Sequence, residues 1–208
     1  MIQPGLISKI IKATGMTQCN PNKTPALKAS LGCDADGEPM EEDWNYRSVV
    51  GMLLYLSTNT RPDIAYAVSQ VARFGHNPKK SHATAVKMIV RYLAGTVNKG
   101  VIYTKLNTFT LNCFVDADFA GMYGYEPNSS PLAAKSRTGY IISLAGCFLL
   151  CKSQVQSTIA LSTGEAEYGA LSQQAMRTVI PIREAIIDLV NIVKSIVKLG
   201  TLLVHMQS

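Results

Sequence analysis

The sequence predicts an α+β fold in which a helical amino-terminal part precedes a part that combines strands and helices. Up to about residue 98, apolar residues recur at the spacing of amphipathic helices, whereas from residue 99 onward several short runs alternate like strands. The chain has 208 residues, of which 47% are hydrophobic and 16% are charged, and this composition suffices for a sizeable core. Two parts are therefore expected, residues 1–98 and residues 99–208.

Four segments of the first part have an apolar face at helical spacing and are predicted to be helices, at residues 5–15, 45–57, 62–74 and 81–94. Gly15 and Gly95 end the first and the last of these helices. Thr60 is a plausible cap for the third helix, and Pro62 suits its first turn. Residues 17–43 are interrupted by proline and glycine and predict an extended linker.

In the second part, strands are predicted at residues 100–104, 109–116 and 138–144, and Ala145-Gly146 can turn the last one into a further strand at 147–153. Helices are expected at residues 163–178 and 181–198, the second opened by Pro181. The apolar residues 201–206 predict a final strand with an exposed edge. The long connection 121–134 is expected to be able to cover the end of the strand before it.

Two acidic pairs separated by 51 residues are the candidate functional groups. Asp116 and Asp118 end an apolar run and share one side of the predicted strand, because strand side chains alternate between faces. Glu165 and Glu167 lie in the first turns of a helix that begins at Ser162, where residues two apart point in different directions. The run from Ser162 to Glu165 has the capping-box pattern, which leaves Glu167 free to face the aspartates.

Carboxylates from two elements can bind a hard cation such as Mg2+, which takes oxygen ligands. The alternative is structural, because acids favour the first turn of a helix and aspartates often begin turns after strands. Both interpretations of the acidic pairs stay open on spacing alone.

The net charge of +6 is unevenly distributed. Residues 34–43 hold six acids and no base, whereas residues 44–112 hold nine Lys/Arg against one acid, a net charge of +8. A basic segment of this kind attracts phosphate backbones, and the candidate contact residues are Lys79, Lys80, Lys87 and Arg91. The alternative is an ordinary solvated helix face.

The five cysteines include no CxxC pair, and the sequence has no signal-peptide pattern. Free thiols in a reducing compartment are therefore expected, in the cytoplasm, the nucleus or a virus-like particle and not outside the cell. The apolar stretches are too short or too interrupted by charge to span a membrane.

Seven segments that cover most of residues 3–187 carry a family resemblance: QPGLISKIIKATGM (3–16), NPNKTPA (20–26), YRSVVGMLLYLSTNTRPDIAYAVSQVARF (46–74), AVKMIVRYLAGT (85–96), DADFAG (116–121), SRTGYIISLAG (136–146) and LSTGEAEYGALSQQAMR (161–177). In this order they resemble the carboxy-terminal part of copia-type retrotransposon polyproteins, from the end of the reverse transcriptase into ribonuclease H. The resemblance implies a helical reverse-transcriptase connection segment followed by an incomplete ribonuclease H-like domain with a mixed sheet and helices.

The same resemblance implies Mg2+-dependent hydrolysis of the RNA strand of RNA/DNA hybrids. Asp116 and Glu167 match the family's catalytic and metal-binding positions, and Asp118 is a further candidate for the metal. When the family's glutamate motif is aligned to start at Glu165 instead, the residues that follow do not match it. This agrees with the predicted capping role of Glu165. The implied partners are an RNA/DNA hybrid or other nucleic acid and the rest of the Pol polyprotein.

The family's third carboxylate, in an Asp-Asn pair on a later strand, is not found in this sequence. Glu184 and Asp188 belong to a helical run and fall on its polar face, and Met206-Gln207-Ser208 stand where the pair is expected. Two-metal chemistry needs several carboxylates, so a weak Mg2+ site or none is expected. An inactive relic that at most binds nucleic acid through its basic middle is therefore the alternative to a ribonuclease H. The paired aspartates of a polymerase site are likewise not found.

Overall fold

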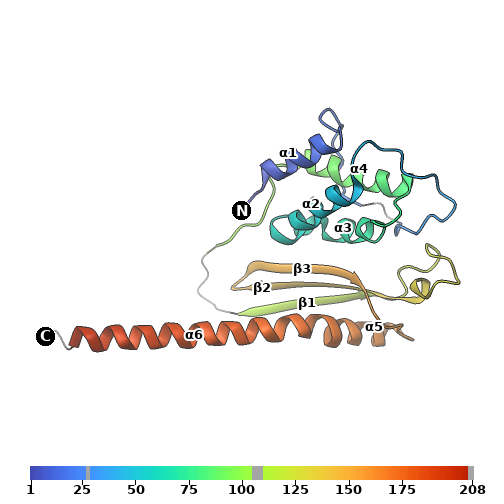
Figure 1. The fold of residues 1–208 in the computed structure, drawn as a ribbon. Coiled ribbons are helices and arrows are strands. Elements are labelled where there is room, and N and C mark those ends of the chain that lie inside the picture. The colour runs from blue at the N-terminus through green and yellow to red at the C-terminus, as the bar shows by residue number, and fades with distance from the viewer. Residues whose placement is uncertain (27–28, 105–109, 206–208) are drawn as a thin grey trace.

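The computed structural model describes residues 1–26, 29–104 and 110–205, and it arranges them in three layers (Figure 1). Helices α1 to α4 form one outer layer, a three-stranded sheet lies in the middle, and the helical run from α5 to α6 forms the other outer layer. The α+β class is thus confirmed, with helices on both faces of a small sheet.

The helical layer contains α1 (Pro4–Ala13), α2 (Tyr46–Asn59), the short 3-10 helix η1 (Pro62–Ile64), α3 (Ala65–Ala72) and α4 (Lys80–Ala94). These elements confirm the four predicted helices, because the apolar side chains of each one meet in a single core. The fully buried members of this core include Ile7, Ile10, Leu53, Leu56, Ile64, Ile89 and Leu93.

The ends of these helices differ from the prediction in detail. Thr60 does not cap the third helix; it follows the last turn of α2, and its hydroxyl donates to Gln3 Oε1 at 2.7 Å. Asn45 caps α2 instead, by accepting the amide of Ser48 at 2.9 Å. Gly95 ends α4 as predicted, although with φ −80° it is not in the left-handed region.

Arg61 is buried to 1% exposure and joins the turn before α3 to the end of α4. Its Nε and Nη2 donate to the carboxylate of Asp63, and its Nη1 donates to the carbonyl of Thr96 at 2.9 Å. Burial alone raises the pKa of Asp63, but the hydrogen bonds from Arg61 and Tyr92 outweigh it and lower that pKa. The stabilisation is therefore present above the ordinary pKa of 3.8 and is lost as the pH falls toward the lowered folded pKa.

The sheet is an antiparallel meander of β1 (Leu111–Asp118), β2 (Arg137–Leu144) and β3 (Cys147–Val155), in the order β1-β2-β3. Ala145 and Gly146 make the β2–β3 turn with φ of 50° and 72°, as the tight hairpin requires, and this predicted turn is confirmed. The expectation of a mixed sheet is wrong for the described residues, since both strand pairs are antiparallel.

The strand predicted at residues 100–104 is not formed. Val101 is buried and its amide donates to the carbonyl of Met1 at 3.0 Å, but Ile102 is 80% exposed and Tyr103 is 53% exposed. This segment therefore runs beside the amino terminus and lacks a neighbouring strand. In the described structure β1 pairs with β2 alone, and residues 100–104 add no strand to its other edge.

The second helical layer is one continuous run of α5 (Thr163–Gly169), the π-helical segment η3 (Ala170–Ala175) and α6 (Met176–His205). Two predictions fail here: Pro181 lies inside α6 instead of opening a new helix, and residues 201–205 are helical instead of forming a strand. Proline removes one backbone hydrogen bond, but Val179 and Ile182 on either side of it pack against the same apolar cluster of the sheet, and these contacts support a continuous helix. The rest of the strand expected at residues 201–206 lies outside the described residues.

α6 packs on the sheet only over its first turns. Tyr140, Ile142 and Ala175 are buried between the layers, and the hydroxyl of Tyr140 bonds Thr178 Oγ1 at 2.9 Å. Ile182 of α6 contacts this cluster, whereas Leu189, two turns farther along the helix, is 62% exposed. Figure 1 shows why, since α6 extends past the edge of the sheet. No helix among the described residues is long and apolar enough to cross a membrane.

Replacing Arg61 by Met should lower the free energy of unfolding by about 2–3 kcal/mol, because Asp63 then loses its cation and Thr96 its donor. Urea denaturation followed by circular dichroism measures the change. The matched control is Arg183→Met, whose ion pair with Glu184 lies on the surface and should contribute less than about 0.5 kcal/mol. Equal losses in the two variants would contradict the structural role of Arg61.

Candidate functional site

Asp116 and Asp118 lie on the same exposed face of β1, as predicted. The strand alternates strictly between half-buried and exposed residues, and Phe114 shares the exposed face with the two aspartates. Cys113 and Val115 point the other way and pack against the layer of α6. The sheet therefore presents its acidic face to the helical layer of α1 to α4.

The turn after β1 holds the carboxylate of Asp118 in place. A Cβ atom at Gly121 would come within 1.9 Å of Asp118 Oδ2, so any other residue there would require the carboxylate to move. Ala120 has φ 49° in the left-handed region, and its amide donates to Ser136 Oγ at 3.2 Å. The sequence DADFAG thus specifies a tight turn in which Asp118 packs against the backbone.

Both aspartates line a cleft of about 460 Å³ between the sheet and the helical layer. Its helical wall is formed by Pro62, Ala65 and Tyr66, and its sheet wall includes Phe114, Asp116, Asp118, Arg137, Ile141 and Cys151. Phe114 is 66% exposed, which is unusual for an aromatic side chain on a sheet face. A cleft of this volume is large enough for a small ligand or part of a polymer.

Arg137 is a buried cation in the wall of this cleft that the sequence analysis did not identify. It is 4% exposed, lies opposite Asp118 in the register and has its guanidinium 5.5 Å from the ring centre of Tyr66. Its Nη1 donates to Ser69 Oγ on α3 at 2.9 Å. Burial lowers the pKa of Arg137, and no carboxylate of the described chain lies within ion-pair distance of it. The pairing register of β1 with β2 places it on the face of Asp118, and no local sequence pattern gives that register.

The thiol in the cleft is not set up as a nucleophile. Cys151 is half-buried, and burial together with the charge of Asp63 raises its pKa to about 11. The thiol is therefore protonated at neutral pH. All five cysteines are free, as predicted.

The connection 121–134 does not cover the aspartates. Met122 is fully buried, and the buried carboxylate of Glu126 forms an ion pair with Arg73 of the helical layer. The hydroxyl of Ser30 donates to the carbonyl of Gly121 at 3.0 Å. None of these residues lines the cleft, so the expected obstruction of the acidic strand end is absent from the described structure.

Glu165 takes the capping role that the sequence predicts. Its amide donates to Ser162 Oγ at 3.1 Å, and its carboxylate accepts the amide of Leu161 at 2.8 Å, one residue before the expected partner. Both bonds satisfy donors at the start of α5 that would otherwise lack a partner.

Glu167 is exposed on α5, but the structure does not bring it to the aspartates. Its neighbour Ala166 is buried, and the carbonyl of Ala166 accepts the Nε2 of Gln156 at 2.8 Å. Gln156 also donates to Thr138, which lies on the sheet face opposite to that of Arg137. α5 therefore packs against the side of the sheet that Asp116 and Asp118 do not occupy, and Glu167 does not line their cleft.

The fit of these residues to Mg2+ is partial. Asp116 and Asp118 offer oxygen ligands from one face, and one or two carboxylates with water and phosphate are a usual set for Mg2+. No group of three or more His, Cys, Asp or Glu side chains suited to a metal occurs among the described residues. The geometry thus suits a single, weakly held ion at the aspartates and not the two-ion site. The assignment of Asp116, Asp118 and Glu167 as ligands stays a prediction.

The four candidate nucleic-acid contacts lie along α4 or directly before it, and three of them have protein partners. Lys80 Nζ pairs with Glu38 at 2.6 Å, and Lys87 Nζ pairs with Glu42 at 2.5 Å. Arg91 Nε donates to the carbonyl of Asn20 at 2.7 Å. Lys79 precedes the helix, and its amide donates to His82 Nδ1 at 2.9 Å. The acidic segment 34–43 supplies the carboxylates, a pairing that the opposite charges of the two segments could have indicated.

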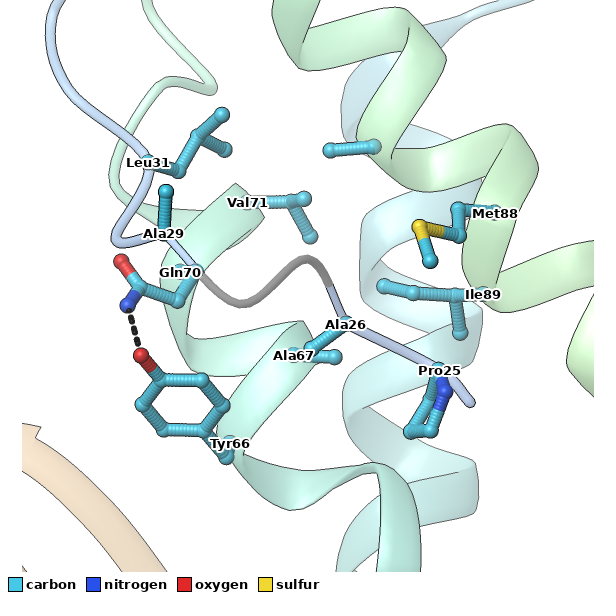
Figure 2. A pocket seen from close by; sticks show the side chains of 11 residues that line it. Pro25, Ala26, Ala29, Leu31, Tyr66, Ala67, Gln70, Val71, Met88 and Ile89 are labelled. Atoms are coloured by element: carbon cyan, nitrogen blue, oxygen red, sulfur yellow. Dashed lines mark hydrogen bonds between the residues drawn. The ribbon is translucent and has the colours of Figure 1, made fainter. Parts of the chain in front are cut away.

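A further, small cavity lies between α3, α4 and the side chains of Pro25, Ala26, Ala29 and Leu31, and it is too small for a ligand (Figure 2). Its volume of about 20 Å³ corresponds to a single water molecule. Gln70 Nε2 donates to the hydroxyl of Tyr66 at 2.8 Å, which orients this ring at the edge of the larger cleft. Gln70 Oε1 is a buried acceptor without a donor in the described part of the chain.

Similar proteins include several from transposons. The chain is 35% identical over 166 residues to the "Retrovirus-related Pol polyprotein from transposon RE1" of Arabidopsis thaliana, and 36% identical over 177 residues to the corresponding polyprotein from transposon TNT 1-94 of Nicotiana tabacum. These matches cover 80% and 82% of this chain but only 11% and 13% of the polyproteins.

A shorter relative is the secreted RxLR effector protein 161 of Plasmopara viticola, which is 37% identical over 134 residues, or 64% of this chain and 89% of that protein. No protein-family profile and no solved structure matches the chain. The similarity to transposon polyproteins extends over both the helical layer and the sheet, because it covers about four fifths of the sequence. The chain therefore corresponds to one segment of the retrovirus-related Pol polyproteins of transposons.

Proposed function

We propose that this chain is the reverse-transcriptase connection and ribonuclease H segment of a copia-type Pol polyprotein, and that by itself it binds RNA/DNA hybrids without cleaving them. Residues 1–98 are the connection part and residues 99–208 the ribonuclease H part in this proposal. The single observation that carries it is that Asp116 lines a cleft on one face of the sheet, whereas α5, which bears Glu167, packs through Ala166 on the other face.

Hydrolysis of a phosphodiester by this family's chemistry requires several carboxylates around the metal ions. A bound Mg2+ would polarise the scissile phosphate and activate a water molecule. Asp116 and Asp118 can hold such an ion and orient it toward the cleft, but Glu167 adds no charge there. The chain's own residues can therefore bind substrate and one cation, and they lack the remaining ligands of a complete centre.

Hybrid binding is assigned to the basic residues around α4. Lys79, Lys80, Lys87 and Arg91 are cations of a segment with a net charge of +8, and they follow one helix. Contacts of this kind read the phosphate backbone and not the base sequence. The rest of the Pol polyprotein is the second proposed partner, and it is the natural source of further carboxylates.

The second candidate function is an active hybrid-specific ribonuclease. The observation that favours it is the open cleft in which Asp116 and Asp118 lie together with the buried cation Arg137. In this alternative, α5 would have to move so that Glu167 reaches the same face of the sheet.

The cleavage assay separates the two functions. We expect no cleavage of a labelled RNA/DNA hybrid with Mg2+ or Mn2+, because the carboxylates do not converge on one side of the sheet. The products are resolved by denaturing gel electrophoresis, with Asp116→Asn and Glu167→Gln as comparison proteins. Cleavage that is lost in both variants would establish the ribonuclease and refute the binding-only proposal.

The binding assay tests the basic surface. The affinity for a hybrid, measured by fluorescence anisotropy, should fall steeply as the salt concentration rises, because each phosphate contact releases counterions. Lys79→Gln with Arg91→Gln should reduce the slope of log affinity against log salt by about 2, one unit for each lost contact. Lys9→Gln with Lys12→Gln on α1 is the matched control with the same loss of charge. A salt-independent affinity, or equal effects of the two double variants, would contradict the assignment.

A further inference from the structure

The acidic segment 34–43 lies along the basic face of α4, with its acids matched to the lysines. Lys80 and Lys87 are two helical turns apart, about 10 Å along the axis. Glu38 and Glu42 pair with these two lysines in the same order along the chain. The basic face that a phosphate strand would contact is therefore the face that the two glutamates occupy.

Backbone contacts fix the acidic segment in this place. The amide of Lys80 donates to the carbonyl of Glu38 at 3.0 Å, and the amide of Met40 donates to the carbonyl of Pro78 at 3.3 Å. Pro39 and Lys79 form an isolated antiparallel bridge. The carboxylates are therefore presented to α4 by a short stretch of sheet-like pairing and do not depend on side-chain attraction alone.

We propose that the acidic segment 34–43 is an internal competitor that occupies the polyanion-binding face of α4, so that a nucleic acid has to displace it. The inference rests on the proposed hybrid binding and adds to it a regulated surface. The segment resembles a phosphate strand in the sign of its charge, and it is covalently tethered beside its site. A tethered competitor lowers the affinity of the chain for every polyanion by the same factor. It leaves the preference among base sequences unchanged.

The contacts are suited to exchange. The side chains of Lys80 and Glu38 are 70% and 72% exposed, and ion pairs of this kind are weak and screened by salt. The pair of Lys87 and Glu42 is less exposed, at 35% and 29%, and forms the firmer end of the segment. A polyphosphate that contacts several cations at once can therefore replace two single carboxylates.

The chain contains its own reporter for this displacement. Trp44 is the single tryptophan of the sequence, and its Nε1 donates to Glu42 Oε2 at 3.2 Å. Its ring stacks on Tyr46 at a centroid distance of 5.9 Å. When Glu42 leaves Lys87, the indole loses this acceptor and its emission should change.

The test measures hybrid affinity and Trp44 fluorescence in the wild-type chain and in the double variant Glu38→Gln, Glu42→Gln. Removing two surface ion pairs should raise the affinity about threefold to tenfold at moderate salt. The matched control is Asp36→Asn, Asp43→Asn, which removes the same charge from exposed positions of the same segment that form no ion pair in the described structure. Addition of the hybrid to the wild-type chain should also change the Trp44 emission.

Three results would overturn the inference. Equal affinities of the wild-type chain and the glutamine variant, with an unchanged Trp44 emission in the bound state, would refute the competitor and leave the proposed hybrid binding intact. An equal gain in hybrid affinity in the Asp36→Asn, Asp43→Asn control would show that the effect comes from the loss of net negative charge and not from the two ion pairs. No binding by any of the three proteins, each shown to be folded by circular dichroism, would refute the competitor and the proposed hybrid binding together.

Discussion

The structure depends on one constraint, which is that both faces of a three-stranded sheet must be covered. Each strand of the meander sends alternate side chains to opposite sides, and so small a sheet is not stable with either side bare. Helices α1 to α4 cover one side and the run from α5 to α6 covers the other (Figure 1). The assignment of the acidic residues follows from which side chains of β1 face which layer.

Polar contacts on each side hold the two layers to the sheet. On the side of α3, the buried Arg137 joins Ser69 and stacks on Tyr66. On the other side, the buried amide of Gln156 joins Thr138 to the carbonyl of Ala166. Buried polar groups of this kind are costly unless they are satisfied, so these bonds select one arrangement of the layers. The same arrangement separates Glu167 from the aspartates.

Much of the local structure could be predicted from the sequence, because it depends on short-range periodicity. The strand period placed Asp116 and Asp118 on one face, and the capping pattern of Ser162 identified the role of Glu165. The helices of the first layer and the turn at Ala145-Gly146 were likewise readable from apolar spacing and turn residues.

The failures concern long-range packing. The apolar residues 201–205 suit a strand or a helix equally well, and the helix propagates from α6 without a strand beside it. Residues 100–104 have strand-like composition, yet Val101 pairs with Met1 at the amino terminus and not with the open edge of β1. Neither the side of the sheet chosen by α5 nor the pairing of the acidic segment 34–43 with α4 is encoded in a local pattern.

The central claim, that Asp116 and Asp118 lie apart from Glu167, can be measured with Mn2+ as a paramagnetic stand-in for Mg2+. In two-dimensional NMR spectra of the labelled chain, sub-stoichiometric Mn2+ should broaden the amide signals of Asp116 and Asp118 strongly and that of Glu167 less, because the broadening falls with the sixth power of the distance from the ion. The Asp116→Asn, Asp118→Asn variant should lose the selective broadening and serves as the control. Equal broadening at Glu167 in the wild-type chain would mean that the three carboxylates converge on one ion, and it would contradict the two-sided arrangement.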